Sequence, residues 1–252
     1  QVVASFVSGE TFEQVDFAKQ SILSLYEEDL HKYDSEQNGR VSAMFRTVSE
    51  QLGTQSMRFK FSVVHKDARY DRLVSSLAFL RESMNVCENV TDPSTLMDLF
   101  VEKENFKMFM ADTGLLVTQA MAGASGSQNA LYKALIFGKL GANLGMVMEN
   151  AVAQMLVANG HELHFHEFEY AERKKDGTRG RPKKYEIDFL TIRDKRVCPI
   201  EVKSSSYRTH KSLDVFFQKY DVKVNERYVL YAKDLQRDGN VVYLPWYMAM
   251  CL

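Results

Sequence analysis

The 252-residue chain has a nearly balanced charge, with 32 Lys and Arg against 33 Asp and Glu, and 45% of its residues are hydrophobic. This composition is typical of a globular protein with one large core or two modest ones, and it excludes disordered and fibrous classes. The three cysteines are widely separated and match no metal-binding or disulfide spacing, which favours reduced thiols in a cytoplasmic protein. No run approaches the roughly eighteen apolar residues that span a bilayer, so we expect no membrane partner.

The first part of the chain has the apolar spacing of helices. From Thr11 to Tyr33, apolar residues that include Leu25 and Leu30 recur at three- and four-residue steps, which places them on one side of a predicted helix. A second helix is predicted near Val41 to Leu52, and a third near Ala68 to Glu82.

A strand pair is predicted after these helices, because short apolar runs between Val86 and Leu116 are punctuated by turn residues. Helix, helix and hairpin is the order of a winged helix, so we predict a helical, winged-helix-like region over residues 1–120. The following stretch, rich in Gly, Ala and Ser, predicts a linker at about residues 118–130.

Residues 121–252 combine strands and helices. A helix near Asn143 to Asn159 precedes the strand-like segments "HELHFHEFEY", "YEIDFLTI" and "RVCPIEVKS". Another helix near Leu213 to Tyr220 and two further strand-like segments follow. This order predicts an α/β (α+β) domain with a mixed sheet and flanking helices.

Two of these predicted strands carry charged residues at positions suited to a catalytic site. Side chains alternate along a strand, so Glu201 and Lys203 share one face of "PIEVKS". In "YEIDFL", the same alternation sends Ile187 and Phe189 into a core and leaves Asp188 on the opposite side. Asp188 and Glu201 would meet if the two strands form a hairpin.

Glu149 supplies a third carboxylate, on a helix face that is otherwise apolar. Burying an unpaired charge is costly, and a metal ion would remove that cost. Mg²⁺ or Mn²⁺ prefers carboxylates and water, so we expect Glu149, Asp188 and Glu201 to be metal ligands. Lys203 would assist the attacking water and offset charge on a phosphate. A solvated Glu–Lys pair with an unrelated Asp is the alternative.

These segments resemble a known superfamily. "EIDF" followed by "PIEVKSS", after a helix carrying Glu149, resembles the PD-(D/E)xK nucleases, with Asp188, Glu201 and Lys203 at the motif positions. Ile187 stands where that superfamily has Pro. The resemblance implies a restriction endonuclease-like fold over residues 121–252 and divalent-metal-dependent cleavage of DNA.

A narrower resemblance covers nearly the whole chain. "KDARYDRLVSSLAFL", "FKMFMADTGLL" and "GKLGANLGMVMENAVAQML" are similar to the uncharacterised C-terminal domain that follows the ATPase core in many prokaryotic AAA-family ATPases. That family implies an ATPase core in the same longer chain, which agrees with a start at Gln1. Here "FGKLG" has Leu140 after Lys139 where a P-loop has Ser or Thr, so we expect no ATP binding by this chain itself.

Positive charge is concentrated in "RGRPKK", whose cationic residues are Arg179, Arg181, Lys183 and Lys184. The segment resembles the core of an AT-hook, in which an Arg-Gly-Arg-Pro run enters the narrow minor groove of A·T-rich DNA. Generic attraction to phosphates and a merely solvated hairpin tip are the alternatives. Near a metal site, such a segment would draw the nucleic-acid backbone towards the carboxylates.

Arg69 and Arg72 begin the third predicted helix and could contact DNA phosphates. A packing surface for an ATPase core is the other interpretation. Two functions therefore remain open: a metal-dependent DNA nuclease, or a catalytically inactive module that binds DNA or protein for an attached ATPase.

Overall fold

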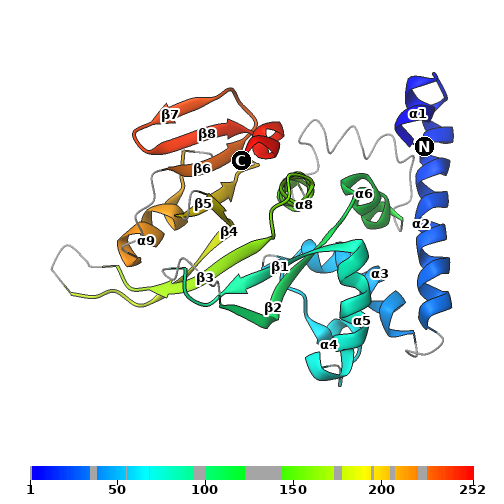
Figure 1. Cartoon of the computed structure of the whole chain (residues 1–252), viewed down its shortest axis with the longest axis horizontal. Helices are drawn as coiled ribbons and strands as arrows, with labels where there is room; N and C mark the ends of the chain where they lie inside the picture. Colours follow the sequence, from blue (N-terminus) through cyan, green and yellow to red (C-terminus); the bar gives the residue numbers. More distant parts are fainter. Residues whose placement is uncertain are drawn as a thin grey trace. The chain divides into compact units, whose positions relative to one another are not determined.

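The computed structural model describes residues 2–34, 39–54, 56–67, 69–93, 100–122, 144–172, 178–193, 196–204, 208–220 and 226–252. The chain forms two compact units (Figure 1). The first comprises Gln1–Asn85 and Lys107–Gln154, and the second comprises Val86–Phe106 and Met155–Leu252. No helix among the described residues is long and apolar enough to cross a membrane.

The first unit is helical. It contains α1 (Val2–Val7), α2 (Phe12–Asp34), α3 (Arg40–Leu52), α4 (Phe61–Val64), α5 (Tyr70–Ser83), α6 (Thr113–Met121) and most of α8 (Leu144–Ala158). The three helices predicted from apolar spacing correspond to α2, α3 and α5. Each of these predictions is confirmed to within two residues at either end.

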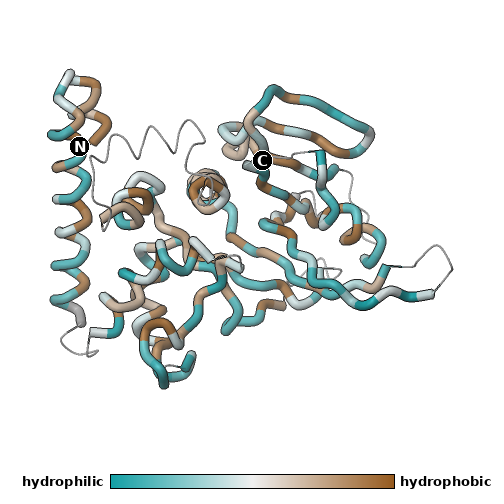
Figure 2. The backbone as a smooth tube through the Cα atoms, turned by 180° about the vertical axis from the view of Figure 1, so that it is seen from behind, coloured by the Kyte–Doolittle hydropathy of each residue, from teal (hydrophilic) through white to brown (hydrophobic). Residues whose placement is uncertain are grey.

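The long helix α2 starts with a reciprocal cap and buries only a narrow row of its side chains. The Thr11 amide donates to Gln14 Oε1 at 2.8 Å, and the Gln14 amide donates to Thr11 Oγ1 at 3.3 Å, which satisfies amides that lack partners at a helix start. Leu30 is 4% exposed but Leu25 is 58% exposed, so the residues predicted to share one side of this helix are not all buried. Figure 2 shows hydrophobic and hydrophilic positions interspersed along this helix.

The region of the predicted linker is partly helical. Helix α6 begins at an Asp112 cap, whose Oδ1 accepts a hydrogen bond from the Leu115 amide at 2.9 Å. Because α6 continues to Met121, residues 118–121 of the predicted linker belong to a helix. Residues 123–130 lie outside the described part of the chain.

A mixed sheet runs through the second unit, as the sequence predicted, and it has eight strands, of which β1 and β2 precede residues 121–252. Its order is β2-β1-β3-β4-β5-β6-β8-β7. The antiparallel β3–β4–β5 meander is joined to parallel neighbours at β1, β6 and β8. The strands are β1 (Met84–Val90), β2 (Val101–Met110), β3 (His164–Tyr170), β4 (Lys183–Arg193), β5 (Arg196–Val202), β6 (Arg227–Tyr231), β7 (Gln236–Asp238) and β8 (Val241–Pro245).

The predicted strand pair is present as β1 and β2, but β1 also pairs with β3, with Glu88 opposite His164. The two strands therefore extend this sheet, whereas the wing of a winged helix would pack beside its own helices. Apolar runs reveal that a segment is a strand, but they do not reveal its pairing partner.

Helix α9 (Lys211–Lys219) connects parallel strands β5 and β6 and covers part of the sheet (Figure 1). Its Leu213, Val215 and Phe216 join a core that includes Ile187 and residues of β3, β5, β6 and β8. Ile187 and Phe189 are fully buried, as strand alternation predicted. The chain ends in a 3₁₀ helix, Trp246–Cys251.

A buried histidine lies within this core. The side chain of His166 is 1% exposed, with Nδ1 2.6 Å from the Val90 carbonyl oxygen and Nε2 2.8 Å from the Tyr220 hydroxyl. In the neutral ring, Nδ1–H donates to the carbonyl and Nε2 accepts from the hydroxyl, so both nitrogens are satisfied. Burial lowers the pKa of His166 from 6.5 to about 4.

This histidine is expected to make the second unit less stable in acid. His166 takes up a proton near pH 6.5 in the unfolded chain and only near pH 4 in the folded chain. Its contribution to the free energy of unfolding is therefore complete above pH 6.5 and is lost as the pH falls to about 4. The full effect is on the order of 3 kcal/mol. Urea unfolding followed by the fluorescence of Trp246, the single tryptophan, measures it. His166→Phe should flatten the pH dependence and His161→Gln should not; equal slopes would contradict this assignment.

Candidate functional site

Asp188, Glu201 and Lys203 meet where β4 and β5 lie side by side. In the β4–β5 ladder Phe189 lies opposite Ile200, and Asp188 and Glu201 are the next residues on their strands. Asp188 Oδ2 accepts a hydrogen bond from the Val202 amide at 2.7 Å. Lys203 Nζ forms an ion pair with Glu201 Oε1. The shared face predicted for Glu201 and Lys203 is thus present.

The Glu201 carboxylate is buried and only half satisfied. The residue is 4% exposed, and its Oε2 has no hydrogen-bond partner among the described residues. Burial raises the pKa of Glu201 above its ordinary value, while the Lys203 ammonium and the Leu213 backbone amide act in the opposite direction. A buried carboxylate oxygen without a partner is energetically costly and indicates a site that a ligand could complete.

Asp214, at the start of α9, also acts on this acid, and sequence reasoning did not assign Asp214 a role at the site. Asp214 raises the pKa of Glu201 through like-charge repulsion. Asp214 Oδ1 itself lies 3.0 Å from Arg227 Nη1 and 3.3 Å from His210 Nδ1. β5, α9, the connection between them and the start of β6 therefore place two acids, Glu201 and Asp214, and three cationic or titratable groups, Lys203, His210 and Arg227, in one region. The i,i+4 spacing of His210 and Asp214 was the available signal.

Glu149, the third predicted metal ligand, belongs to the first unit. Its Oε2 lies 3.4 Å from Nζ of Lys107, a lysine whose side chain is 1% exposed. The partner that a buried carboxylate requires is therefore a lysine of β2, which sequence reasoning did not consider. Among the residues that the structure describes, no group of three or more His, Cys, Asp and Glu side chains could hold a metal ion.

The basic segment, Arg179–Lys184, lies where β4 begins. Arg179, Arg181, Lys183 and Lys184 are all exposed, and none of their side chains forms an ion pair or hydrogen bond with another described residue. The Gly180 amide donates to the Glu172 carbonyl at 2.8 Å, and a Cβ on Gly180 would lie 3.1 Å from that oxygen. Glycine thus permits this close approach. Residues 173–177, at the predicted tip, lie outside the described residues.

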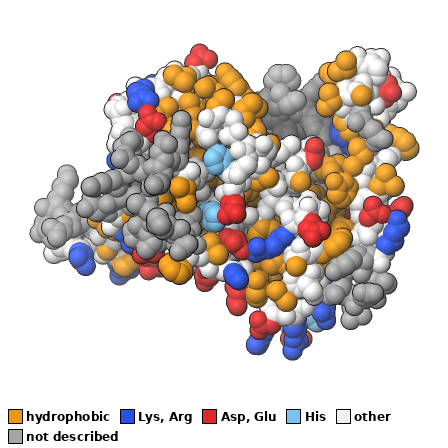
Figure 3. All heavy atoms as spheres, in the orientation of Figure 1, with side chains coloured by type: hydrophobic (Ala, Val, Ile, Leu, Met, Phe, Trp, Pro, Cys, Tyr) orange, Lys and Arg blue, Asp and Glu red, His pale blue; other side chains and the backbone are white. Residues whose placement is uncertain are grey.

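Arg69 and Arg72, the other predicted DNA contacts, lie at the start of α5, and both are exposed. Elsewhere the charge is mixed, and on the face shown in Figure 3 Lys and Arg are interspersed with Asp and Glu. This agrees with a formal net charge of -1.

A family model described as a domain of unknown function, DUF8612, matches residues 1–128, slightly more than half of the chain. The chain belongs to the DUF8612 family. In this DUF8612 protein, residues 144–248 match a second model, DUF4143, also described as a domain of unknown function. DUF4143 is a C-terminal domain associated with AAA ATPases, which confirms the predicted resemblance for residues 144–248 but not over nearly the whole chain. No curated protein and no solved structure matches the chain.

Proposed function

We propose that this chain is the C-terminal part of a AAA-family ATPase whose second unit is a nuclease-like domain that binds DNA and cleaves its phosphodiester bonds with a divalent metal ion. The observation that carries the proposal is the Glu201–Lys203 ion pair beside Asp188, with one buried Glu201 oxygen unpartnered. The association of DUF4143 with AAA ATPases supports an attached ATPase core in the same longer chain.

The donor set fits Mg²⁺ or Mn²⁺ held by Asp188 and Glu201. Mg²⁺ commonly binds through one or two carboxylates and keeps several waters, so a third carboxylate is not required. Glu201 offers the oxygen that has no other partner among the described residues. Glu149 stays a predicted ligand. When bound, the ion would lower the pKa of a coordinated water and offset negative charge on the phosphate.

The protein's own residues have distinct parts in this proposal. The ammonium of Lys203 favours the ionised form of Glu201 against the effect of burial, and it can donate a hydrogen bond to a phosphate oxygen or to the attacking water. The Val202 amide holds one oxygen of Asp188 and so fixes the orientation of that carboxylate. Arg179, Arg181, Lys183 and Lys184 would attract the DNA backbone, which the two acids alone would repel.

The test is cleavage of single-stranded, duplex and branched DNA with Mg²⁺, with Mn²⁺ and with EDTA. We expect cleavage that requires the metal. The pairing of Glu149 with Lys107 and the absence of three clustered metal-ligating side chains among the described residues favour the second candidate, an inactive module that binds DNA for the ATPase. Salt-sensitive binding without cleavage under any of these conditions would establish the module and exclude the nuclease.

The basic segment is expected to carry the DNA affinity in either case. Replacing Arg179 and Arg181 by Ala should weaken binding and lower the slope of log K against log salt by about 2, because each lost phosphate contact removes roughly one released counterion. Fluorescence anisotropy of a labelled duplex over a range of KCl concentrations measures this slope. Lys60→Ala with Lys66→Ala, two exposed lysines of the first unit, is the control. An unchanged slope would make the segment a solvated turn.

A further inference from the structure

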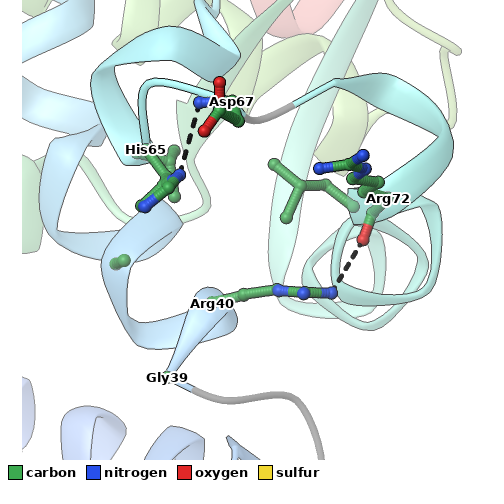
Figure 4. A pocket seen from close by; sticks show the side chains of 8 residues that line it. Gly39, Arg40, His65, Asp67 and Arg72 are labelled. Atoms are coloured by element: carbon green, nitrogen blue, oxygen red, sulfur yellow. Dashed lines mark hydrogen bonds between the residues drawn. The ribbon is translucent and has the colours of Figure 1, made fainter.

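A cavity of about 400 Å³ lies in the first unit, at the starts of α3 and α5 (Figure 4). Val64 and Leu73 form part of its apolar lining, and Arg40, His65, Asp67 and Arg72 supply its polar groups. Small-molecule sites combine an apolar surface with a few polar groups, in cavities of about 300–1,000 Å³. The cavity therefore has the size and the lining of a ligand site.

Its charge favours an anion. Arg40 donates from Nη1 to the Arg72 carbonyl at 3.1 Å, which fixes the Arg40 guanidinium beside the cavity. The guanidinium of Arg72 forms no ion pair or hydrogen bond with any other described residue. Asp67 is the one acid among the described lining residues, so within the described part of the lining two permanent positive charges face a single negative charge. Figure 4 shows the Arg40 side chain reaching towards the backbone of Arg72.

We propose that this cavity binds a phosphate monoester of about nucleotide size. Its phosphate would lie between the guanidinium groups of Arg40 and Arg72, because planar guanidinium groups bind phosphate oxygens in pairs and match a charge near -2. Its less polar part would lie against Val64 and Leu73. Such a ligand is either a free nucleotide or the 5′-phosphate end of a DNA strand. Two arginines can hold a phosphate without a P-loop, and the site is independent of the one on β4 and β5.

The cavity distinguishes Arg72 from Arg69, two arginines to which the sequence assigned the same role. Both are exposed, but Arg72 lines the cavity and Arg69 is not among its lining residues. If this surface contacted only a continuous DNA backbone, loss of either arginine would have a similar effect. A cavity site predicts that Arg72 matters and Arg69 does not, so Arg69 provides a matched control on the same helix start.

Isothermal titration calorimetry without metal tests the proposal, using AMP, adenosine, inorganic phosphate, and an oligonucleotide with and without a 5′-phosphate. We expect AMP to bind and adenosine to bind at least tenfold more weakly. Arg72→Glu should weaken AMP binding by about tenfold or more, because charged hydrogen bonds are lost and a like charge is introduced, and Arg69→Glu should leave it unchanged. Ala43→Met, which fills part of the cavity, is a second variant should Arg72→Glu fail to fold.

Binding of AMP alone would identify a free nucleotide as the ligand, and additional binding of the phosphorylated oligonucleotide would identify a strand end; both support the proposal. It would be overturned by adenosine binding as tightly as AMP, by inorganic phosphate binding as tightly as AMP, by equal losses for Arg72→Glu and Arg69→Glu, or by no binding at millimolar ligand. Because no metal is present, these results do not depend on whether the chain cleaves DNA.

Discussion

Replacing Lys203 by Ala is expected to lower metal-dependent DNA cleavage by at least about 100-fold, the size of effect typical for loss of one preorganised donor at a reacting phosphate. Lys203 is the ion-pair partner of Glu201 Oε1, and Glu201 is 4% exposed. Without the ammonium, burial and the nearby Asp214 would raise the pKa of Glu201 further and favour its neutral form, which is a poorer metal ligand. Initial rates of cleavage at saturating Mg²⁺ measure the loss.

Lys211→Ala is the matched control for this prediction. Lys211 lies in the same unit, its side chain is 54% exposed, and it pairs with Glu172 at 2.7 Å. Its loss should change cleavage less than about twofold, because exposed ion pairs contribute little. Asp188→Asn should lower cleavage like Lys203→Ala, while circular dichroism verifies that each variant folds. Full activity of Lys203→Ala would show that the ion pair is structural and that any observed cleavage arises elsewhere.

The sequence predicted the β4–β5 part of the site because its signal is local. Strand alternation requires only neighbouring residues, and it correctly placed Ile187 and Phe189 in the core and Glu201 beside Lys203. The same reasoning assigned the helices α3 and α5, whose apolar residues recur at helical spacing. Features set within one strand or one helix can therefore be recognised without knowledge of the rest of the fold.

Features that join distant segments could not be predicted in this way. Glu149 contacts Lys107, which lies 42 residues away in the sequence. A single sequence contains no signal that indicates this partner in preference to a metal ion. His166 bonds to Val90 and Tyr220, which lie 76 and 54 residues away. The pairing of β1 with β3 and the cavity beside Arg40 and Arg72 have the same origin, since each depends on how elements pack and not on the pattern within one element.

A buried asparagine in the first unit provides the strongest expected effect on stability. Asn150 is fully buried in α8, and its Oδ1 accepts from the Met110 amide at 2.8 Å. Its Nδ2 donates to the Met110 carbonyl at 3.0 Å and to Thr113 Oγ1 at 2.9 Å. One side chain therefore satisfies both backbone groups of Met110 where β2 ends. Backbone polar groups that are buried without partners are rare because they are costly.

Replacing Asn150 by Leu is expected to lower the free energy of unfolding by about 3–5 kcal/mol, since leucine leaves a buried amide and a buried carbonyl unpaired, at about 1–3 kcal/mol each, and also removes the bond to Thr113. Asn150→Asp keeps the acceptor for the Met110 amide but loses both donated bonds, so a comparable loss is expected. Urea unfolding followed by circular dichroism measures both. Asn159→Leu changes an exposed asparagine whose side-chain contacts are 3.5 Å long, and should cost less than about 0.5 kcal/mol. Equal costs at positions 150 and 159 would show that the Asn150 bridge does not stabilise the fold.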